Sequence, residues 1–351
     1  MRPGRLRLVA LAVLLTTLTA GCWDARDVND RTPAIAMSFD HDRKGWRVSI
    51  LEVTQLPSDG KTAVGGSETG SGPTLTDAIE NLRAELDKVL YIGSVKLFVV
   101  GPGVLRGRLP AVLAYLRQHV EVDATAYILA TTEPAASLLG KPDPIAGLTT
   151  LHLLEEFDRE TVVRDGATPV HLWDAFRRSL TPGESNLVPV VGTSYSGTIA
   201  AIGMALVTGD GELKTIVDRG ETVTLRWIMN KGSQVVIGLP DGSAAKILSL
   251  KTARSFPDAR TLRLEIAVIA EAHAVSGPMT STMARTLAAA IATSVTERTT
   301  ALLAKLRAAG ANVPDWREGA AEAGFPDQDP SAATVIVHVK VHVIPIVAPY
   351  V

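Results

Sequence analysis

The stretch TSTMARTLAAAIATSVTERTTALLAKLRA, residues 280–308, is the longest helical pattern in the sequence and decides how the C-terminal part folds. Its large apolar residues recur at helical spacing on one side, and they are Met283, Leu287, Ile291, Val295, Leu302 and Leu306. Gly310 follows, and glycine is common just after the end of a helix. A helix with one apolar side must bury that side, so we expect it to lie on a sheet.

The strands of that sheet are predicted on both sides of the helix. Residues 245–252 and 261–272 have strand patterns, and in the second of them apolar and polar residues alternate. A closing strand presents an apolar face of Val335, Val337, Val339, Val341 and Val343, opposite Ile336, His338, Lys340, His342 and Ile344. Residues 243–351 are therefore predicted to form an α+β domain that contains the long helix.

An α/β domain is predicted over residues 22–140. The pattern of residues 34–53 indicates two strands joined by a tight turn. Thr74 can cap a helix with Asp77 at its third position, and residues 90–100 have the pattern of a buried strand. Alternating helices and strands of this kind favour a mixed sheet covered by helices.

Residues 141–242 are predicted to hold a proline-rich connector and then a β-rich middle domain. Gly209-Asp210-Gly211 lies between two apolar runs, and Asp-Gly is typical of a tight hairpin turn. The predicted fold class is therefore α+β, with three domains in which mixed or antiparallel sheets pack against helices.

The first 21 residues have the layout of a lipoprotein signal peptide, with arginines before a short apolar run. Leu18-Thr19-Ala20-Gly21-Cys22 resembles the lipobox at which bacterial lipoproteins are cleaved. Cys22 is thus the expected lipidation site, and two acyl chains on it would hold the mature chain stably to a membrane. Thr19 stands where the lipobox usually has leucine, so ordinary cleavage that leaves Cys22 as a free thiol stays an alternative.

Composition limits the classes of partner. Of the 351 residues, 46% are hydrophobic and 21% are charged, which is the composition of a folded globular protein. The 35 Lys and Arg residues are balanced by 37 Asp and Glu residues, so the net charge of −2 provides no broad positive field and nucleic acid is not an expected partner. A single cysteine excludes an intrachain disulfide framework and a cysteine-rich zinc site.

Two loop motifs resemble ligand-binding loops but lack required residues. Gly60-Lys61-Thr62 ends like a phosphate-binding loop, yet Gln55 occupies the position of the first required glycine. Residues 40–45 begin like a calcium loop, but Lys44 and Leu51 occupy positions at which oxygen ligands are needed. We therefore expect solvated loops at both places.

Two further motifs are rejected, one because of the distance between its residues and one because a required residue is missing. His338 and His342 share a strand face, but four residues of strand separate their Cα atoms by about 13 Å, which is too far for both to bind one zinc ion directly. Residues 192–197 lack the second glycine of a nucleophile elbow, because Ser196 occupies its position. No catalytic, cofactor-binding or metal-binding residue is predicted.

Several tracts resemble the Ger(x)C family, the GerAC-type lipoprotein C subunits of the germinant receptors of endospore-forming bacteria. They extend over nearly the whole mature length. The tracts are Gly21-Cys22-Trp23-Asp24 with the polar stretch to Asp30, the strand Leu90-Tyr91-Ile92-Gly93 continued to Gly101, Gly203-Met204-Ala205-Leu206, and Leu225-Arg226-Trp227. The chain departs from the family near the first hairpin, where it has Ala36-Met37-Ser38-Phe39 and relatives usually have Gly-Ile-Asp. Its C-terminal helix is rich in Ala and Thr, where relatives are strongly charged.

The resemblance implies a lipid-anchored, noncatalytic subunit on the outer face of the inner spore membrane, needed for spore germination. Its implied partners are the membrane, through diacylglycerol on Cys22, and integral A-type and B-type receptor subunits. One alternative is an extracytoplasmic solute-binding lipoprotein that delivers a small ligand to a transporter, a class that usually has two similar lobes around a cleft. A lipid-anchored hydrolase is a third hypothesis, and the sequence offers no nucleophile and base for it.

Overall fold

The computed structural model describes most of the chain after residue 29. The described residues are 30–52, 66–143, 147–158, 167–193, 199–231, 234–239, 243–273, 280–313, 315–326 and 333–344. The predicted signal peptide, Cys22 and the Gly60-Lys61-Thr62 loop lie outside these residues.

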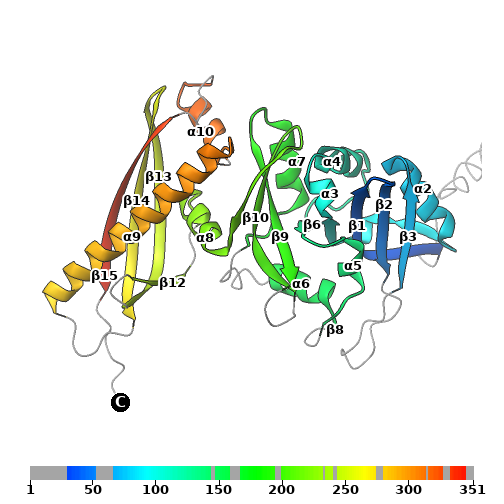
Figure 1. Cartoon of the computed structure of the whole chain (residues 1–351), viewed down its shortest axis with the longest axis horizontal. Coiled ribbons are helices and arrows are strands. Elements are labelled where there is room, and N and C mark those ends of the chain that lie inside the picture. Colours follow the sequence, from blue (N-terminus) through cyan, green and yellow to red (C-terminus); the bar gives the residue numbers. More distant parts are fainter. Residues whose placement is uncertain are drawn as a thin grey trace, which may run out of the picture.

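The N-terminal lobe, residues 30–218, is built on one large mixed sheet (Figure 1). Nine strands of the described residues form it in the order β11-β10-β9-β6-β5-β1-β2-β3, with β4 paired to β1. The central neighbours β1, β5, β6 and β9 run parallel, and antiparallel hairpins extend both sides. The strands are β1 (Arg31–Asp42), β2 (Gly45–Glu52), β3 (Ser67–Gly72), β4 (Val89–Tyr91), β5 (Leu97–Val100), β6 (Tyr127–Thr131), β9 (Ser185–Thr193), β10 (Ile199–Thr208) and β11 (Leu213–Asp218).

Helices cover both faces of this sheet, which explains why β5 is apolar at every position. Phe98 packs on the side of α2, α4 and α7, whereas Leu97 and Val99 pack on the side of α5 and α6. The predicted strand at 90–100 is interrupted by the 3-10 helix η2 (Ile92–Ser94). The helices are α2 (Leu75–Glu85), α3 (Pro102–Leu105), α4 (Leu109–Gln118), α5 (Ala136–Leu139), α6 (Thr149–Asp158) and α7 (Leu172–Leu180), and a small sheet pairs β7 (Pro142–Asp143) with β8 (Gly147–Leu148).

The start of α2 confirms the predicted capping box. The backbone N–H of Asp77 donates to the Thr74 hydroxyl, and the backbone N–H of Thr74 donates to the Asp77 carboxylate. Helix α2 lies close to β3, where Gly70 is in contact with the helix backbone. A Cβ atom at Gly70 would stand 2.2 Å from both the Ala78 carbonyl oxygen and the Leu82 nitrogen, so this position requires glycine.

The domain boundary predicted at residue 140 falls inside this one sheet. The β10–β11 hairpin was correctly predicted, but it is joined through β9 to β6 rather than forming a sheet of its own. Helices α6 and α7 lie in the connection between β6 and β9, so the chain from Thr131 to Ser185 makes a crossover between two parallel strands.

The C-terminal lobe, residues 235–344, has a four-stranded sheet in the order β12-β13-β14-β15 (Figure 1). Strands β13 and β14 are antiparallel, and β15 pairs in parallel with β14 after the long helix has crossed the sheet. The sheet begins a few residues before the predicted boundary at 243. Its elements are β12 (Val235–Gly238), β13 (Ala244–Asp258), β14 (Thr261–His273), α9 (Ser281–Ala308), α10 (Trp316–Glu322) and β15 (Thr334–Ile344).

Helix α9 lies on one face of that sheet, as its apolar spacing predicts. Leu287, Ile291 and Val295 are buried against β13 and β14, whereas Met283 is 38% exposed, so the buried side begins one turn later than predicted. Ser294 and Thr299 are also buried on this side. Gly310 has φ +64° just beyond the helix, a conformation that favours glycine.

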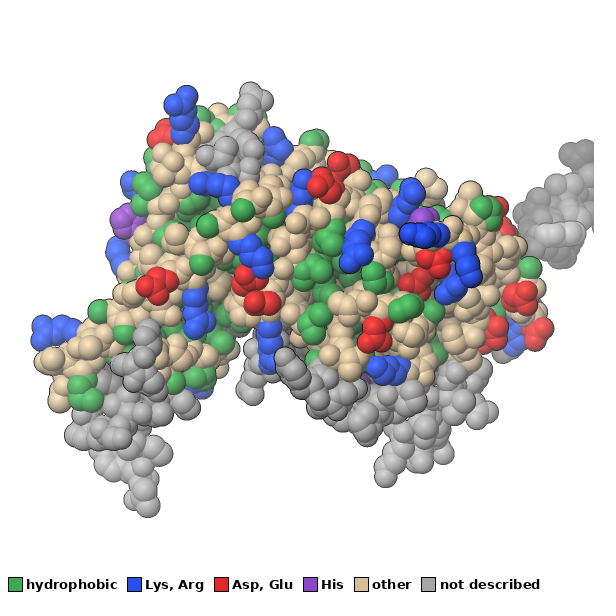
Figure 2. All heavy atoms as spheres, in the orientation of Figure 1, with side chains coloured by type: hydrophobic (Ala, Val, Ile, Leu, Met, Phe, Trp, Pro, Cys, Tyr) green, Lys and Arg blue, Asp and Glu red, His purple; other side chains and the backbone are tan. Residues whose placement is uncertain are grey.

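Helix α8 (Arg219–Ile228) joins the two lobes, and a continuous apolar cluster crosses between them. This cluster includes Val217 of β11, Leu225 and Ile228 of α8, and Leu302 and Leu306 of α9. The lobes therefore share core packing. Acidic and basic side chains are interspersed over both lobes on the face drawn in Figure 2. No helix of the described residues combines the length and the apolar character that crossing a membrane requires.

Candidate functional site

A group of five charged side chains, three of them buried, lies where the two lobes meet. We call it the ionic junction and define it by Asp174, Arg177 and Arg178 of α7, Glu184 before β9, and Asp315 at the start of α10. The first four belong to the N-terminal lobe, and Asp315 belongs to the C-terminal lobe. Helix α7 places its charges there because Leu172 and Ala175, on the same helix, pack into the core of the large sheet.

Asp315 binds both arginines of α7. Its Oδ1 accepts a hydrogen bond from Arg177 Nη2 at 2.8 Å, and its Oδ2 accepts one from Arg178 Nη2 at 3.4 Å. Both arginines also donate to Oδ1 of Asp174, each at 3.1 Å. Arg177 reaches Glu318 of α10 as well, at 3.0 Å. Two helices from different lobes are thus held together by shared carboxylates.

The backbone of Asp315 is held as firmly as its side chain. Its N–H donates to Glu184 Oε2 at 3.0 Å, and its carbonyl accepts from Arg254 of β13 at 3.2 Å. The residue has φ +66°, in the left-handed region that non-glycine residues rarely occupy. Such a conformation costs on the order of 1 to 3 kcal/mol and persists where surrounding contacts determine it. Asp315 is therefore fixed by contacts from both lobes.

Burial gives these charges unequal strength. Arg178 and Glu184 are each 1% exposed, whereas the Arg177 side chain is 37% exposed. Burial alone would raise the pKa of Asp315, but the positive charges of Arg178 and Arg177 outweigh that effect and hold this pKa below its ordinary value. At Glu184 burial dominates and raises the pKa, although the N–H of Asp315 opposes it.

Two buried atoms of the ionic junction have no hydrogen-bond partner in the described part of the chain, Arg178 Nη1 and Glu184 Oε1. An unsatisfied buried polar atom costs about 1 to 3 kcal/mol. The junction is therefore strongly paired but not fully satisfied. Such a contact can hold two lobes in one arrangement.

A second polar contact between the lobes lies beside α8. Lys305 of α9 donates to Glu221 of α8 at 2.6 Å and to the Ile216 carbonyl of β11 at 3.3 Å. Glu221 also forms the capping box of α8 with Asp218. The start of α8 is thus tied to both neighbouring elements.

The contacts of the ionic junction hold the two lobes in position. Across the described stretches, no group of three His, Cys, Asp or Glu side chains is arranged to hold a metal ion. Asp174 and Asp315 of the ionic junction each bind both arginines.

The residues singled out in the sequence lie elsewhere. Cys22 lies outside the described residues, as does part of 192–197. The 40–45 segment forms the β1–β2 turn, in which Asp42 accepts from the Lys44 N–H, while the Asp40 carboxylate binds the backbone N–H groups of Ala135 and Ala136. His338 and His342 lie on the exposed side of β15.

The ionic junction itself was not predicted. Asp174 and Arg178 have the i, i+4 spacing of a helical ion pair, which was the available signal. That spacing is common on solvated helix surfaces, and the sequence does not indicate that Asp315, 137 positions after Arg178, completes the site.

Comparisons with known proteins agree with one another. Residues 24–193 match a family described as the spore germination protein N-terminal domain. The protein YfkR of Bacillus subtilis strain 168, whose name assigns it to spore germination, is 21% identical over 249 residues, which are 66% of this chain and 63% of YfkR. Spore germination protein KC of the same organism is 22% identical over 276 residues, 70% of this chain and 67% of that protein.

A solved structure is similar over almost the whole chain. The crystal structure of the GerBC protein matches with a TM-score of 0.57 at 14% identity, covering 88% of this chain and 96% of that one. At this identity the likeness concerns the fold. It includes both lobes, because 88% of the chain exceeds either lobe alone.

Proposed function

We propose that the chain is a spore germination protein of the Ger(x)C family and acts as a lipid-anchored, noncatalytic subunit of a nutrient germinant receptor complex. The observation that carries this proposal is the family match over residues 24–193, which spans β1 to β9 of the N-terminal lobe. The family match supports the germination role, and the place in a receptor complex and the anchor are the finer parts of the proposal.

The proposed anchor is diacylglycerol on Cys22, with the chain on the outer face of the inner spore membrane. Strand β1 begins at Arg31, nine residues after Cys22. Nine residues span at most about 30 Å when extended, so the anchor would keep the N-terminal lobe next to the membrane. There it would meet integral A-type and B-type subunits.

The subunit would act by contact. Shared core packing and the ionic junction hold its two lobes in one arrangement, so a partner that binds one lobe also fixes the position of the other. The two lobes are unlike each other, with a nine-stranded sheet in one and a four-stranded sheet in the other, both counted over the described residues. This disfavours the alternative of a solute-binding lipoprotein built from two similar lobes.

Spores of a strain that retains no other receptor of this family would test the proposal. Deletion of the gene should abolish the fall in optical density that nutrients trigger. The wild-type gene should restore it, and Cys22→Ala should not, because the chain would lose its acyl chains. Palmitate labelling of both forms gives the direct readout of the anchor. Normal nutrient germination of the deletion strain would contradict the receptor role, and an unlabelled wild-type chain would contradict the anchor.

A further inference from the structure

Strand β15 forms an open edge of the C-terminal sheet. It pairs in parallel with β14 from Thr334 to Ile344 without a shift of register, and no strand of the described residues lies on its other side. These 11 residues include no proline and no glycine. Native edge strands are usually short or interrupted, because an open row of backbone N–H and C=O groups can pair with another strand. A long, regular and open edge is therefore a site at which a further strand can bind.

The side chains around this edge leave room for one more strand. On the face that α9 covers, the five valines of β15 from Val335 to Val343 are only half-buried. Figure 1 shows the first turns of α9 extending past β15, and Met283, one turn before the buried Leu287, is 38% exposed. The apolar side of α9 thus continues beyond the last described strand. A strand added beside β15 would cover both the valines and Met283.

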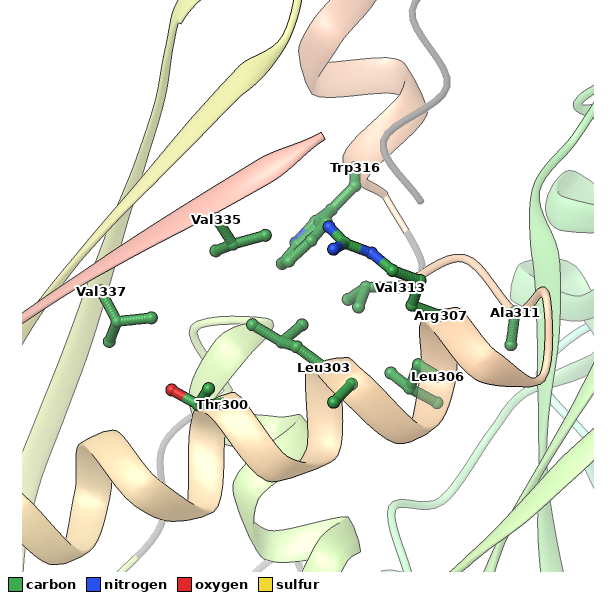
Figure 3. A pocket seen from close by; sticks show the side chains of 10 residues that line it. Thr300, Leu303, Leu306, Arg307, Ala311, Val313, Trp316, Val335 and Val337 are labelled. Carbon is green, nitrogen blue, oxygen red and sulfur yellow. The ribbon is translucent and has the colours of Figure 1, made fainter. Parts of the chain in front are cut away.

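A pocket of about 150 Å³ continues this apolar surface at the start of β15 (Figure 3). Val335 and Val337 point into it from β15, and Leu303 lines it from α9. Ala304 and Arg307 of α9 also line the pocket and are exposed, so it is open to solvent. An apolar side chain of an added strand would have aliphatic walls to contact here.

The opposite face of β15 carries basic side chains. His338, Lys340 and His342 are exposed on it, and β15 contains no acidic residue. Within the described part of the chain, none of these three side chains forms an ion pair or a hydrogen bond. Opposite charges that face each other on neighbouring strands attract. A strand that fits this face therefore carries carboxylates at alternate positions.

A second copy of the chain fits the edge poorly. If the valines of two copies are to share one face, Lys340 must lie opposite a residue of its own face. That residue is a threonine, an isoleucine, a histidine or the second Lys340, whichever register the two strands adopt. No register gives Lys340 a carboxylate.

We propose that the open edge of β15 binds an extended segment of another protein in which hydrophobic residues alternate with Glu or Asp. The hydrophobic side chains of that segment pack beside the valines of β15 and against α9, and its carboxylates face Lys340 and the two histidines. Backbone hydrogen bonds to β15 hold the segment as a fifth strand of the sheet. This inference depends neither on the receptor role nor on the anchor proposed above.

The test uses the full chain in mild detergent at pH 7 and a fluorescein-labelled peptide in which valine and glutamate alternate. Fluorescence anisotropy should show saturable binding, and a peptide of the same length in which valine and lysine alternate should bind at least fivefold more weakly. Hydrogen–deuterium exchange followed by mass spectrometry locates the contact. The glutamate peptide should slow exchange of about half of the amides in 334–344, because alternate N–H groups of β15 point to the open edge. Exchange in β12, at the opposite edge of the sheet, should stay unchanged.

Lys340→Glu tests the charge preference, and Lys251→Glu is its matched control. Lys251 of β13 is exposed and lies in register with Ala267 of β14, which lies in register with Lys340, so the control makes the same change two strands away from the edge. Lys340→Glu should weaken binding of the glutamate peptide at least threefold and strengthen binding of the lysine peptide, whereas Lys251→Glu should leave both unchanged. Both positions are exposed, so both variants should unfold at the wild-type temperature.

Three results would overturn the proposal. One is unslowed exchange in β15 when the glutamate peptide is added, and another is an equal effect of the two variants on peptide binding. The third is dimerisation of the chain alone in analytical ultracentrifugation with the β15 amides protected, because a second copy would then occupy the edge.

Discussion

Replacing Arg178 with methionine tests whether the ionic junction fastens the two lobes. Methionine keeps an unbranched apolar side chain but removes the guanidinium, which is 1% exposed and binds both Asp174 and Asp315. Breaking a buried ion pair from one side costs about 3 to 5 kcal/mol, because the remaining charge stays buried without its partner. We therefore expect Arg178→Met to lower the free energy of unfolding by about 3 kcal/mol or more.

Arg177→Met is the matched control. Arg177 contacts the same two carboxylates, but its side chain is 37% exposed, and water screens its interactions. Exposed pairs contribute about 0.2 to 1 kcal/mol, so this variant should lose about 1 kcal/mol or less. Urea unfolding at pH 7, followed by tryptophan fluorescence and by far-ultraviolet circular dichroism, measures both.

A double-mutant cycle separates the ion pair from side-chain packing. In a background of Asp174→Asn, the cost of Arg178→Met should fall, because one of the two carboxylates that it leaves unpaired has been neutralised. Equal losses for Arg178→Met and Arg177→Met, or an unchanged cost in the Asp174→Asn background, would refute the reasoning that burial makes Arg178 the stronger contact.

Three further variants test other parts of the structure. Leu287→Asp places a charge on the buried side of α9 and should lower the free energy of unfolding by more than about 3 kcal/mol, with protease sensitivity confined to residues after about 243. Met283→Asp, at a 38% exposed position one turn earlier, should have little effect. Equal protease resistance of the two variants would contradict the burial of this side. Glu184→Gln removes a buried carboxylate whose pKa is raised by burial, so it should stabilise the chain at pH 7. The gain in free energy of unfolding should disappear as the pH falls below about 4.5, where wild-type Glu184 is protonated in both the folded and the unfolded state. A gain that persists at low pH in urea unfolding would exclude this cause. Gly70→Ala forces β3 away from the backbone of α2 and should lower the free energy of unfolding by about 1 to 3 kcal/mol. Gly66→Ala should leave the free energy of unfolding unchanged, because the space around its Cβ position is open. Equal unfolding midpoints of the two variants would contradict the close approach of β3 and α2.

The sequence predicted those elements whose signals are local. The apolar side of α9, the Thr74 capping box and the Asp-Gly hairpin each depend on residues that are close together in the sequence. The structure confirms them, except that Met283 of α9 is exposed. The α+β class follows from such elements. Secondary-structure patterns of this kind carry the information of periodicity and turn chemistry.

The division of the sheet could not be predicted in the same way. The pairing that joins β6 to β9 involves Ala130 with Val190, and two helices lie between them in the chain. Periodicity shows that each strand is apolar, but it does not show which strand lies next to it. The predicted connector is therefore part of a crossover between two strands of one sheet.

The ionic junction escaped prediction for a related reason. A charged residue on an amphipathic helix is usually solvated, and nothing local distinguishes Arg178 from its exposed neighbour Arg177. Their difference lies in tertiary burial, because the Arg178 side chain is 1% exposed and the Arg177 side chain 37%, although Asp315 binds both. The functional assignment, in contrast, came from the tract around Cys22 and from later family-like tracts.

Affinity capture of the chain from spore membranes tests the receptor role most directly. The chain would carry a C-terminal tag, be solubilised in mild detergent from spores of the bacterium that encodes it, and be analysed for copurifying proteins by mass spectrometry. The receptor role predicts that integral A-type and B-type germinant receptor subunits copurify in amounts comparable to the chain itself. Recovery of the wild-type chain without any integral membrane subunit, from membranes that contain those subunits, would contradict it.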